Sequence, residues 1–454
     1  MPGRITVLGL GPGNPALRTI AAELSLQQAT RIILRTTVHP GLEDLADDPR
    51  VTSCDDLYES LPTFSLVYDA IANRVVAAAR ETDVVFAVPG HPRFGESSVT
   101  AVLALAAQFA VSVNLIEGIS AVDAIITLLG IDPIDSGVQL LDGTACVETL
   151  HTGDFRSGVH AVDPSQPCLI NQVYSSSIAS AVKLSLMRYF PDTHPVSIIQ
   201  AASAPGLERI RECTLFELDH QSFDHLTSVW IPALTPLTDL RSIKTLQWLV
   251  ALLRSPGGCA WDRKQTHTSL RDALIEESYE VLDAVDAGDG ANLQEELGDL
   301  LLQVIMHAQI AEEMESFMFA DILESVNAKL IRRHPHVFGD AVALTPKQVV
   351  ETWNAVKAQE RNGHFSTPGG ESNGIGLPRS ASALSRVARQ MANTSDADSN
   401  PLDDDEALQL GNDLLNAVDA IVRRGGDPDR MLFAALQGRG KGVADSVIHG
   451  VKPT

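Results

Sequence analysis

Five acidic residues at helical spacing are the part of the chain best suited to chemistry. Glu276, Glu277 and Glu280 lie in LRDALIEESYEVLDAV, and Glu296 and Asp299 follow in LQEELGDLLLQVIMHAQIAEE after a short GDG break. Residues three apart on a helix share a face. If the two helices pack antiparallel, the carboxylates of residues 277, 280, 296 and 299 converge on one pocket, where they repel one another unless a divalent cation lies among them.

Mg²⁺ is the cation that suits such a pocket. It prefers oxygen ligands at roughly 2.1 Å in an octahedron, which it shares with water and substrate phosphates. The pattern therefore predicts a metal site for phosphoryl chemistry in a helical domain. A run of glutamates on a helix is more often a solvated face. Here, however, Leu274 and Val281 border the first set of acids and Leu297 and Leu300 border the second, which a purely solvated face would not show.

Composition narrows the class of protein. A chain of 454 residues suggests two or three domains, and a hydrophobic content of 44% is enough for their cores. A net charge of −24 argues against nucleic acid and anionic membranes as partners, because both are bound through Lys and Arg. It does not argue against a nucleotide, whose phosphates a metal ion can neutralise.

The same sequence predicts a cytoplasmic location. No apolar run reaches the roughly 18–20 residues of a membrane span. The opening MPGRITVLGLGPG leads into a strand and a glycine turn and does not resemble a signal peptide. The five cysteines are scattered without a CxxC motif, which favours free thiols in a reducing compartment over disulfides or a zinc site.

Alternating strand and helix patterns predict an α/β architecture for the first half of the chain. The expected strands are 5–9, 31–35, 83–88, 111–116, 168–173, 196–201 and 227–234. A linker is expected at 235–245, with a mostly helical region after it. A break rich in Gly, Ser and Asn spans 362–380, and an acidic Ser/Asn-rich run at 394–406 predicts a mobile loop.

Two glycine–proline loops at strand ends predict a second site. Glycine lets the backbone approach a ligand closely, and loops at the carboxyl ends of strands form the crevice in which α/β sheets bind ligands. A GxGxxG dinucleotide fingerprint would need glycine where Asn14 stands, so that motif is incomplete. The candidate binding residues are Gly11, Pro12, Gly13, Pro89, Gly90, His91 and Pro92.

The helical region resembles the MazG family of nucleoside triphosphate pyrophosphohydrolases over about residues 240–362. EExxE and ExxD separated by fifteen residues carry the resemblance, together with GGCAWD before QTH, and RRHPHVFGD and TWNAVKAQE after them. The resemblance implies that a nucleoside triphosphate (NTP) and water give a nucleoside monophosphate and pyrophosphate. It also implies that Glu277, Glu280, Glu296 and Asp299 hold Mg²⁺ or Mn²⁺, while Glu276 positions water or supports the ligands.

Four further residues match MazG positions that contact the substrate's phosphates or base. Lys329 and Arg333 are four apart on an expected helix, and so are Trp353 and Lys357. Without the resemblance, solvation would be the commoner role for these cations and core packing for the tryptophan. With it, they are the expected substrate-binding residues.

The segment 3–234 resembles the tetrapyrrole methylase family, which binds S-adenosylmethionine. GLGPGNPALRT, VPGHP and EGISAVDA carry this resemblance. QLLDGT and NQVYSSSIASAVKLSLMRYFP point to its YabN-like branch, in which the methylase domain is fused to a MazG domain. His91 stands where many tetrapyrrole methylases have Asp, which argues against cobalamin- or sirohaem-type activity.

These inferences divide the chain into an α/β domain (1–234), a linker (235–245), an all-α MazG-like domain (246–362) and a helical region (363–454). In the last region, 408–426 is either a degenerate, non-catalytic MazG repeat or part of a capping helical pair. The α/β domain either methylates a small molecule or serves as a ligand sensor or dimerisation scaffold. The intact acids argue against a non-catalytic nucleotide-binding protein. Members of both families dimerise, so a homodimer is expected.

Overall fold

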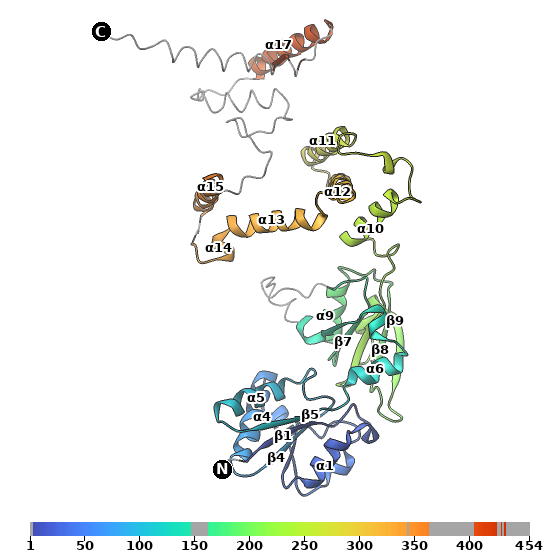
Figure 1. Cartoon of the computed structure of the whole chain (residues 1–454), viewed down its shortest axis with the longest axis vertical. Helices are drawn as coiled ribbons and strands as arrows, with labels where there is room; N and C mark the ends of the chain where they lie inside the picture. The colour runs from blue at the N-terminus through green and yellow to red at the C-terminus, as the bar shows by residue number, and fades with distance from the viewer. Residues whose placement is uncertain are drawn as a thin grey trace, which may run out of the picture. The chain divides into compact units, whose positions relative to one another are not determined.

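The computed structural model describes residues 3–146, 162–342, 345–362 and 404–424, together with Pro428, Met431 and Leu432 (Figure 1). The chain divides into two compact units, Met1–Phe319 and Ala320–Thr454. The first unit holds two β-sheets with the helices that cover them, followed by a group of helices. The second unit, where it is described, is helical.

The first sheet is entirely parallel, with strand order β3-β2-β4-β1-β5. Its strands are β1 (Ile5–Gly9), β2 (Ile32–Leu34), β3 (Val51–Ser53), β4 (Val84–Val88) and β5 (Val113–Ile116). The central strands β2 and β4 are buried and apolar along their whole length, and β1 is interrupted only by the half-buried Thr6, as expected when helices cover both faces of a parallel sheet.

Helices pack on both faces of this sheet. They are η1 (Pro15–Leu17), α1 (Ile20–Gln28), α2 (Glu43–Ala46), α3 (Asp55–Ser60), α4 (Phe64–Ala79) and α5 (Ser97–Gln108). Alternate residues of β1 belong to different cores. Val7 packs with the α4 and α5 side chains, whereas Leu8 packs with Ala22 and Leu26 of α1. This alternation arises because successive side chains of a strand point to opposite faces of the sheet. The two cores use the strand interiors, and the loops at the strand ends remain available to form a site.

The second sheet is mixed, with strand order β6-β7-β10-β8-β9. Its strands are β6 (Gln139–Asp142), β7 (Cys168–Asn171), β8 (Pro195–Gln200), β9 (Arg209–Thr214) and β10 (Thr227–Ile231). Only β6 and β7 run parallel. Its helices are α6 (Ala121–Leu129), α7 (Pro133–Ser136), α9 (Ser176–Leu186) and η3 (Leu215–His220). Apolar residues of α9 and η3 cover one face of the sheet, and those of α6 cover the other.

The remaining helices of the first unit carry the acidic motif. They are α10 (Ile243–Arg254), η4 (Asp262–Lys264), α11 (Arg271–Ala287) and α12 (Gly290–Glu313). Gly288 ends α11 in the left-handed conformation, with φ +65°, and the Asp289 side chain caps α12 by accepting from two backbone amides. This short connection packs α11 against α12, and α10 packs against α12 through Val250, Ile305 and Met306.

The second unit contains α13 (Phe319–Arg333), α14 (Pro335–Phe338), α15 (Pro346–Asn362) and α17 (Asp404–Val422). Pro335 disfavours helical geometry in the residue before it, and α13 ends at Arg333. The predicted breaks at 362–380 and 394–406 lie outside the described residues, apart from Asn362 in α15 and residues 404–406 in α17. Of the segment 408–426, residues up to Val422 are helical.

Every strand expected from the sequence is present. The strand at 5–9 has the expected bounds, the one at 196–201 is shifted by one residue to 195–200, and the others are shorter than expected. Three strands, β3, β6 and β9, were not among the expected ones. Helix α10 begins at Ile243, within the stretch expected as a linker. All five cysteines are free. Among the described helices, none combines the length and the apolar character that crossing a membrane requires.

Candidate functional site

Three of the predicted metal-binding carboxylates meet where α11 packs on α12. One carboxylate oxygen from each of Glu277, Glu280 and Glu296 lies within 4.8 Å of the other two. Asp299 is close enough for its charge to raise the pKa of Glu277. The helical spacing thus brings three of the four predicted ligands together, two from α11 and one from α12, and Asp299 of α12 is not part of this group.

The acids of this cluster oppose one another's ionisation. Burial raises the pKa of Glu277, and the charges of Asp299 and Glu280 raise it further. Burial likewise raises the pKa of Glu296, with the charge of Glu280 adding to the effect. A neighbouring like charge disfavours the ionised form, so a cation would relieve the cluster. Carboxylate oxygens are the ligands that Mg²⁺ prefers, and the donor set therefore fits this metal.

Two neighbours complete this site. Glu276 is exposed on α11, and its charge also raises the pKa of Glu277. Gln303, a buried residue of α12, acts on Glu277 in the opposite direction and lowers this pKa. Gln303 was not among the candidates from the sequence. The signal that could have revealed it is a lone amide within the apolar face of a helix.

The predicted substrate-binding residues belong to the second unit. The guanidinium of Arg333 lies over the Trp353 ring, 5.2 Å from its centroid. Glu360 pairs with Arg333 through Nη2 and Oε2 at 2.6 Å and also with Arg332. Hydrogen bonds from Arg333 and then Arg332 lower the pKa of Glu360 to about 2. The structure thus brings Arg333 and Trp353 together, beside an acid that sequence reasoning had missed.

The other two predicted substrate residues are Lys329 and Lys357. Lys329 is exposed on α13, one helical turn before Arg333. Lys357 lies on α15, and its side chain is outside the described part of the structure.

The two glycine loops of the α/β domain pair with each other. Gly11 N donates to Gly90 O at 3.2 Å, and Gly90 N donates to Gly11 O at 2.8 Å. Both have positive φ, +80° and +66°, a conformation that glycine adopts without steric cost. Pro12 and Pro92 are buried, Pro89 and His91 are half-buried, and Arg93 N donates to His91 Nδ1 at 3.1 Å. The two loops expected to form a crevice at the ends of β1 and β4 are therefore joined side by side.

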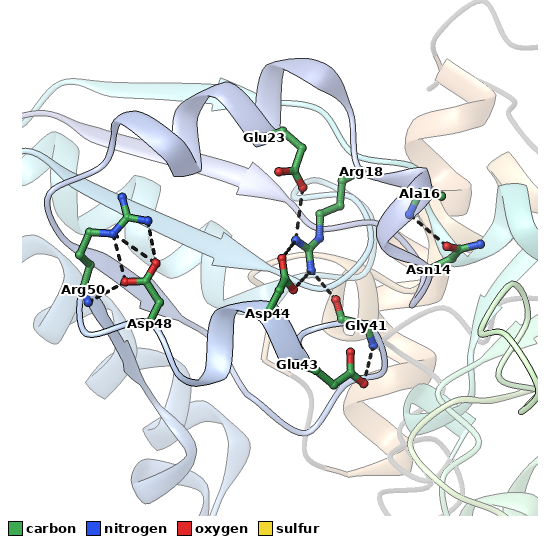
Figure 2. Close-up of polar contacts among 9 residues, drawn as sticks. All are labelled: Asn14, Ala16, Arg18, Glu23, Gly41, Glu43, Asp44, Asp48 and Arg50. Carbon is green, nitrogen blue, oxygen red and sulfur yellow. Dashed lines mark hydrogen bonds and ion pairs between the residues drawn. The ribbon is translucent and has the colours of Figure 1, made fainter.

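A buried arginine, Arg18, helps to hold the loop that carries Gly13. The Arg18 side chain is 1% exposed, and its Nη1 lies 2.7 Å from Asp44 Oδ2 and 3.2 Å from Glu23 Oε1. Figure 2 shows Arg18 also reaching the carbonyl of Gly41. Gly41 lies against Gly13, since a Cβ added at Gly41 would meet Gly13 O at 2.8 Å. These contacts hold the loop that carries Gly13 against its neighbour.

A cavity of about 270 Å³ opens beside the second glycine loop. Its lining comes from the segment after β4, from α5 and from the carboxyl ends of β6 and β7, and consists of Arg93, Gly95, Glu96, Ser97, Thr100, Asp142 and Gln172. Glu96 is buried and pairs with Arg35, Oε2 to Nη1 at 3.3 Å, while Arg35 Nε donates to Tyr58 Oη at 2.9 Å. Ligand sites often lie where two parts of a fold meet.

One histidine faces the first glycine loop. The Nε2 atom of His39 lies 3.3 Å from Gly11 O. Burial lowers the pKa of His39 to about 4, so the imidazole is neutral at pH 7 and Nε2 donates to the carbonyl. Neither Arg35 nor His39 was predicted from the sequence, although Arg35 directly follows β2 and strand ends are where such residues gather.

Comparison with known proteins finds a matching family for the α/β part of the chain and another for its helical part. The model of the tetrapyrrole (corrin/porphyrin) methylases matches residues 4–219, and that of the MazG nucleotide pyrophosphohydrolase domain matches residues 265–338. The nucleoside triphosphate pyrophosphohydrolase/pyrophosphatase MazG of Thermotoga maritima is 50% identical over 143 residues, 32% of this chain and 52% of that protein. The nucleoside triphosphate pyrophosphohydrolase of Escherichia coli (strain K12) is 43% identical over 123 residues, 27% of this chain and 47% of that protein.

One relative matched across both domains is the uncharacterized protein YabN of Bacillus subtilis (strain 168). It is 39% identical over 392 residues, which are 86% of this chain and 76% of that protein. The chain therefore belongs to the YabN-like family, with a tetrapyrrole methylase domain followed by a MazG domain.

Proposed function

We propose that the chain is a Mg²⁺-dependent nucleoside triphosphate pyrophosphohydrolase. The observation that carries this proposal is the cluster of Glu277, Glu280 and Glu296, whose oxygens lie within 4.8 Å of one another. The MazG match and the activities named for the MazG relatives support it. In the reaction, a water oxygen bonds to the α-phosphorus while the bond from that phosphorus to the α–β bridging oxygen breaks. The bridging oxygen keeps the bonding electron pair and leaves with pyrophosphate.

The residues of the chain would take three roles: holding the cation, orienting water and binding the substrate. Glu277, Glu280, Glu296 and Asp299 would hold the cation, which would neutralise phosphate charge, while Glu276 orients water or supports a ligand. Lys329, Arg333 and Lys357 would bind phosphates, and Trp353 would contact the base. Arg333 is bonded to Glu360 in the structure. A phosphate presents oxygens to a guanidinium as a carboxylate does, so substrate would compete with Glu360 for this arginine.

Pyrophosphate release across the NTPs, with Mg²⁺ or Mn²⁺, tests this function. Glu280→Gln and Asp299→Asn should each lower kcat by roughly 100-fold or more, because even partners outside the ligand shell contribute 10–100-fold. Glu312→Gln, at an exposed acid near the end of α12, is the matched control. Unchanged rates in both cluster variants would refute the metal site, and release of orthophosphate would refute the reaction.

For the α/β domain we propose S-adenosylmethionine binding at the paired glycine loops. Two observations support it: Gly11 and Gly90 join the two loops, and the cavity beside them could admit a small methyl acceptor. Calorimetry with S-adenosylmethionine and its demethylated product tests binding. Formation of that product during incubation with candidate acceptors separates a methyltransferase from a ligand sensor or dimerisation scaffold. No heat with either ligand at millimolar concentration would count against the site.

A homodimer is the assembly that we propose. Helix α11 buries only Ala284 among its described side chains, whereas Tyr279, Leu282 and Val285 are more than half exposed. Such an apolar face needs a partner surface. Light scattering of the intact chain tests the proposal, and a monomer would refute it.

A further inference from the structure

One carboxylate of α15, that of Glu360, bonds two neighbouring arginines of α13. Arg333 Nε donates to both oxygens of Glu360, at 3.3 and 3.2 Å, and Arg333 Nη2 donates to Oε2 at 2.6 Å. Arg332 Nε donates to Oε1 at 2.7 Å. The Glu360 side chain is 13% exposed and that of Arg333 is 17% exposed. Glu360, largely shielded from solvent, therefore takes up donors of both guanidinium groups.

The surroundings of Arg333 restrict how a phosphate can reach it. Its guanidinium lies over the Trp353 ring, 5.2 Å from the centroid, so one of its faces is covered. The hydrogen-bond donors of a guanidinium point outward from the edges of its plane, and the edge formed by Nε and Nη2 bonds Glu360. Such a fork of two N–H groups fits a phosphate as well as a carboxylate. A phosphate at this edge would have to displace Glu360, and the negative charge of Glu360 opposes a phosphate at any other edge.

We propose that Glu360 holds the place of a substrate phosphate at Arg333 and thereby limits the affinity of the chain for polyphosphates. This inference rests on the proposed pyrophosphohydrolase function. Glu360 pairs with Arg333 in the free chain, yields it when an NTP binds and regains it as pyrophosphate leaves. Binding that is equally strong in the ground state and the transition state lowers KM without raising kcat. A carboxylate that weakens such binding therefore costs the chemical step nothing and favours release of the product.

Steady-state kinetics of pyrophosphate release by the full chain, at saturating Mg²⁺, measure this role. Glu360→Gln keeps the length of the side chain and removes its charge. KM for the NTP that the wild type hydrolyses fastest should fall by about 10-fold, the difference between a hydrogen bond to a charged acceptor and one to a neutral acceptor. The inhibition constant of added pyrophosphate should fall by a similar factor, and kcat should not rise. If Glu360 served only to orient Arg333, its loss would raise KM instead.

Two matched controls separate this effect from a general change of charge or stability. Glu351→Gln removes an exposed charge from the same helix. Glu313→Gln breaks another carboxylate–guanidinium pair, in which Arg254 Nη2 lies 2.7 Å from Glu313 Oε2. Neither residue belongs to the acid cluster or to the predicted substrate-binding set. Both variants should therefore keep the KM and the pyrophosphate inhibition constant of the wild type.

Each result decides the question. An unchanged or raised KM in Glu360→Gln, or an equal fall in either control, would overturn the inference while leaving the proposed function standing. A wild-type chain that releases pyrophosphate from none of the NTPs would overturn both. Thermal unfolding verifies that the variants are folded. If Glu360→Gln is not, Glu360→Asp replaces it, and KM should then fall by a smaller factor because the carboxylate is withdrawn by one methylene. Failure of both variants to fold would show that Glu360 serves folding and would also overturn the inference.

Discussion

Replacing Glu277 with Gln should reverse the order of stability of the wild type and the variant when Mg²⁺ is added. The carboxylate oxygens of Glu277 and Glu280 lie within 4.8 Å. Two unit charges at this distance repel by about 1 kcal/mol in water-like surroundings, the appropriate limit for groups facing solvent. Glu277→Gln removes one charge at nearly constant volume. The free energy of unfolding of the metal-free variant should therefore exceed that of the wild type by at most about 1 kcal/mol. The variant should accordingly unfold at a higher temperature.

Mg²⁺ should act in the opposite direction. A ligand that binds only the folded state at 100 times its Kd stabilises that state by about 2.7 kcal/mol. The wild type should gain this stabilisation, whereas the variant, having lost one ligand, should gain much less at the same concentration. The two effects have opposite signs, so a general loss of packing cannot imitate them.

Unfolding followed by helical circular dichroism, first with EDTA and then across a Mg²⁺ titration, provides the assay. Glu312→Gln should respond to Mg²⁺ as the wild type does. If the variant is less stable than the wild type in EDTA, the acids do not repel as argued. If Mg²⁺ stabilises both chains equally, Glu277 is not a ligand.

Three further outcomes are expected. The pKa of Glu360 is lowered to about 2, so its contribution to stability is present above its ordinary value of 4.5 and is lost as pH falls from there towards 2. Glu360→Gln should unfold more readily at pH 7 and lose that acid dependence, and an unchanged pH profile of unfolding would contradict the pairing with Arg333. Asp44→Asn removes the closest charged partner of the buried Arg18 guanidinium and should cost roughly 1–3 kcal/mol and weaken S-adenosylmethionine binding, whereas normal unfolding and calorimetry would refute the supporting role. Truncation after residue 375 should reduce stability or dimerisation yet leave metal-dependent pyrophosphate release detectable, and a folded, dimeric truncation without activity would show that the removed region carries active-site residues.

Much of the architecture could be predicted from local patterns. Buried central strands such as β2 and β4 are continuous apolar runs, and these are visible in the chain because both faces of a parallel sheet are covered. The three strands that were missed, β3, β6 and β9, all lie at sheet edges. An edge strand faces solvent and needs no apolar run, and β9 with its sequence RIRECT is largely exposed. Its strand character comes from pairing with β8, which local composition does not record.

The sequence by itself determined which acids share a helix face, because a spacing of three residues acts through the local geometry of one helix. It likewise placed both glycine loops at strand ends. Tertiary structure alone decided the partners that complete each site. Arg18 meets Asp44 across 26 positions, and Arg333 meets Glu360 across 27. These contacts depend on how separate elements pack, and an isolated Arg in a chain carries no mark of the carboxylate that packing will bring to it.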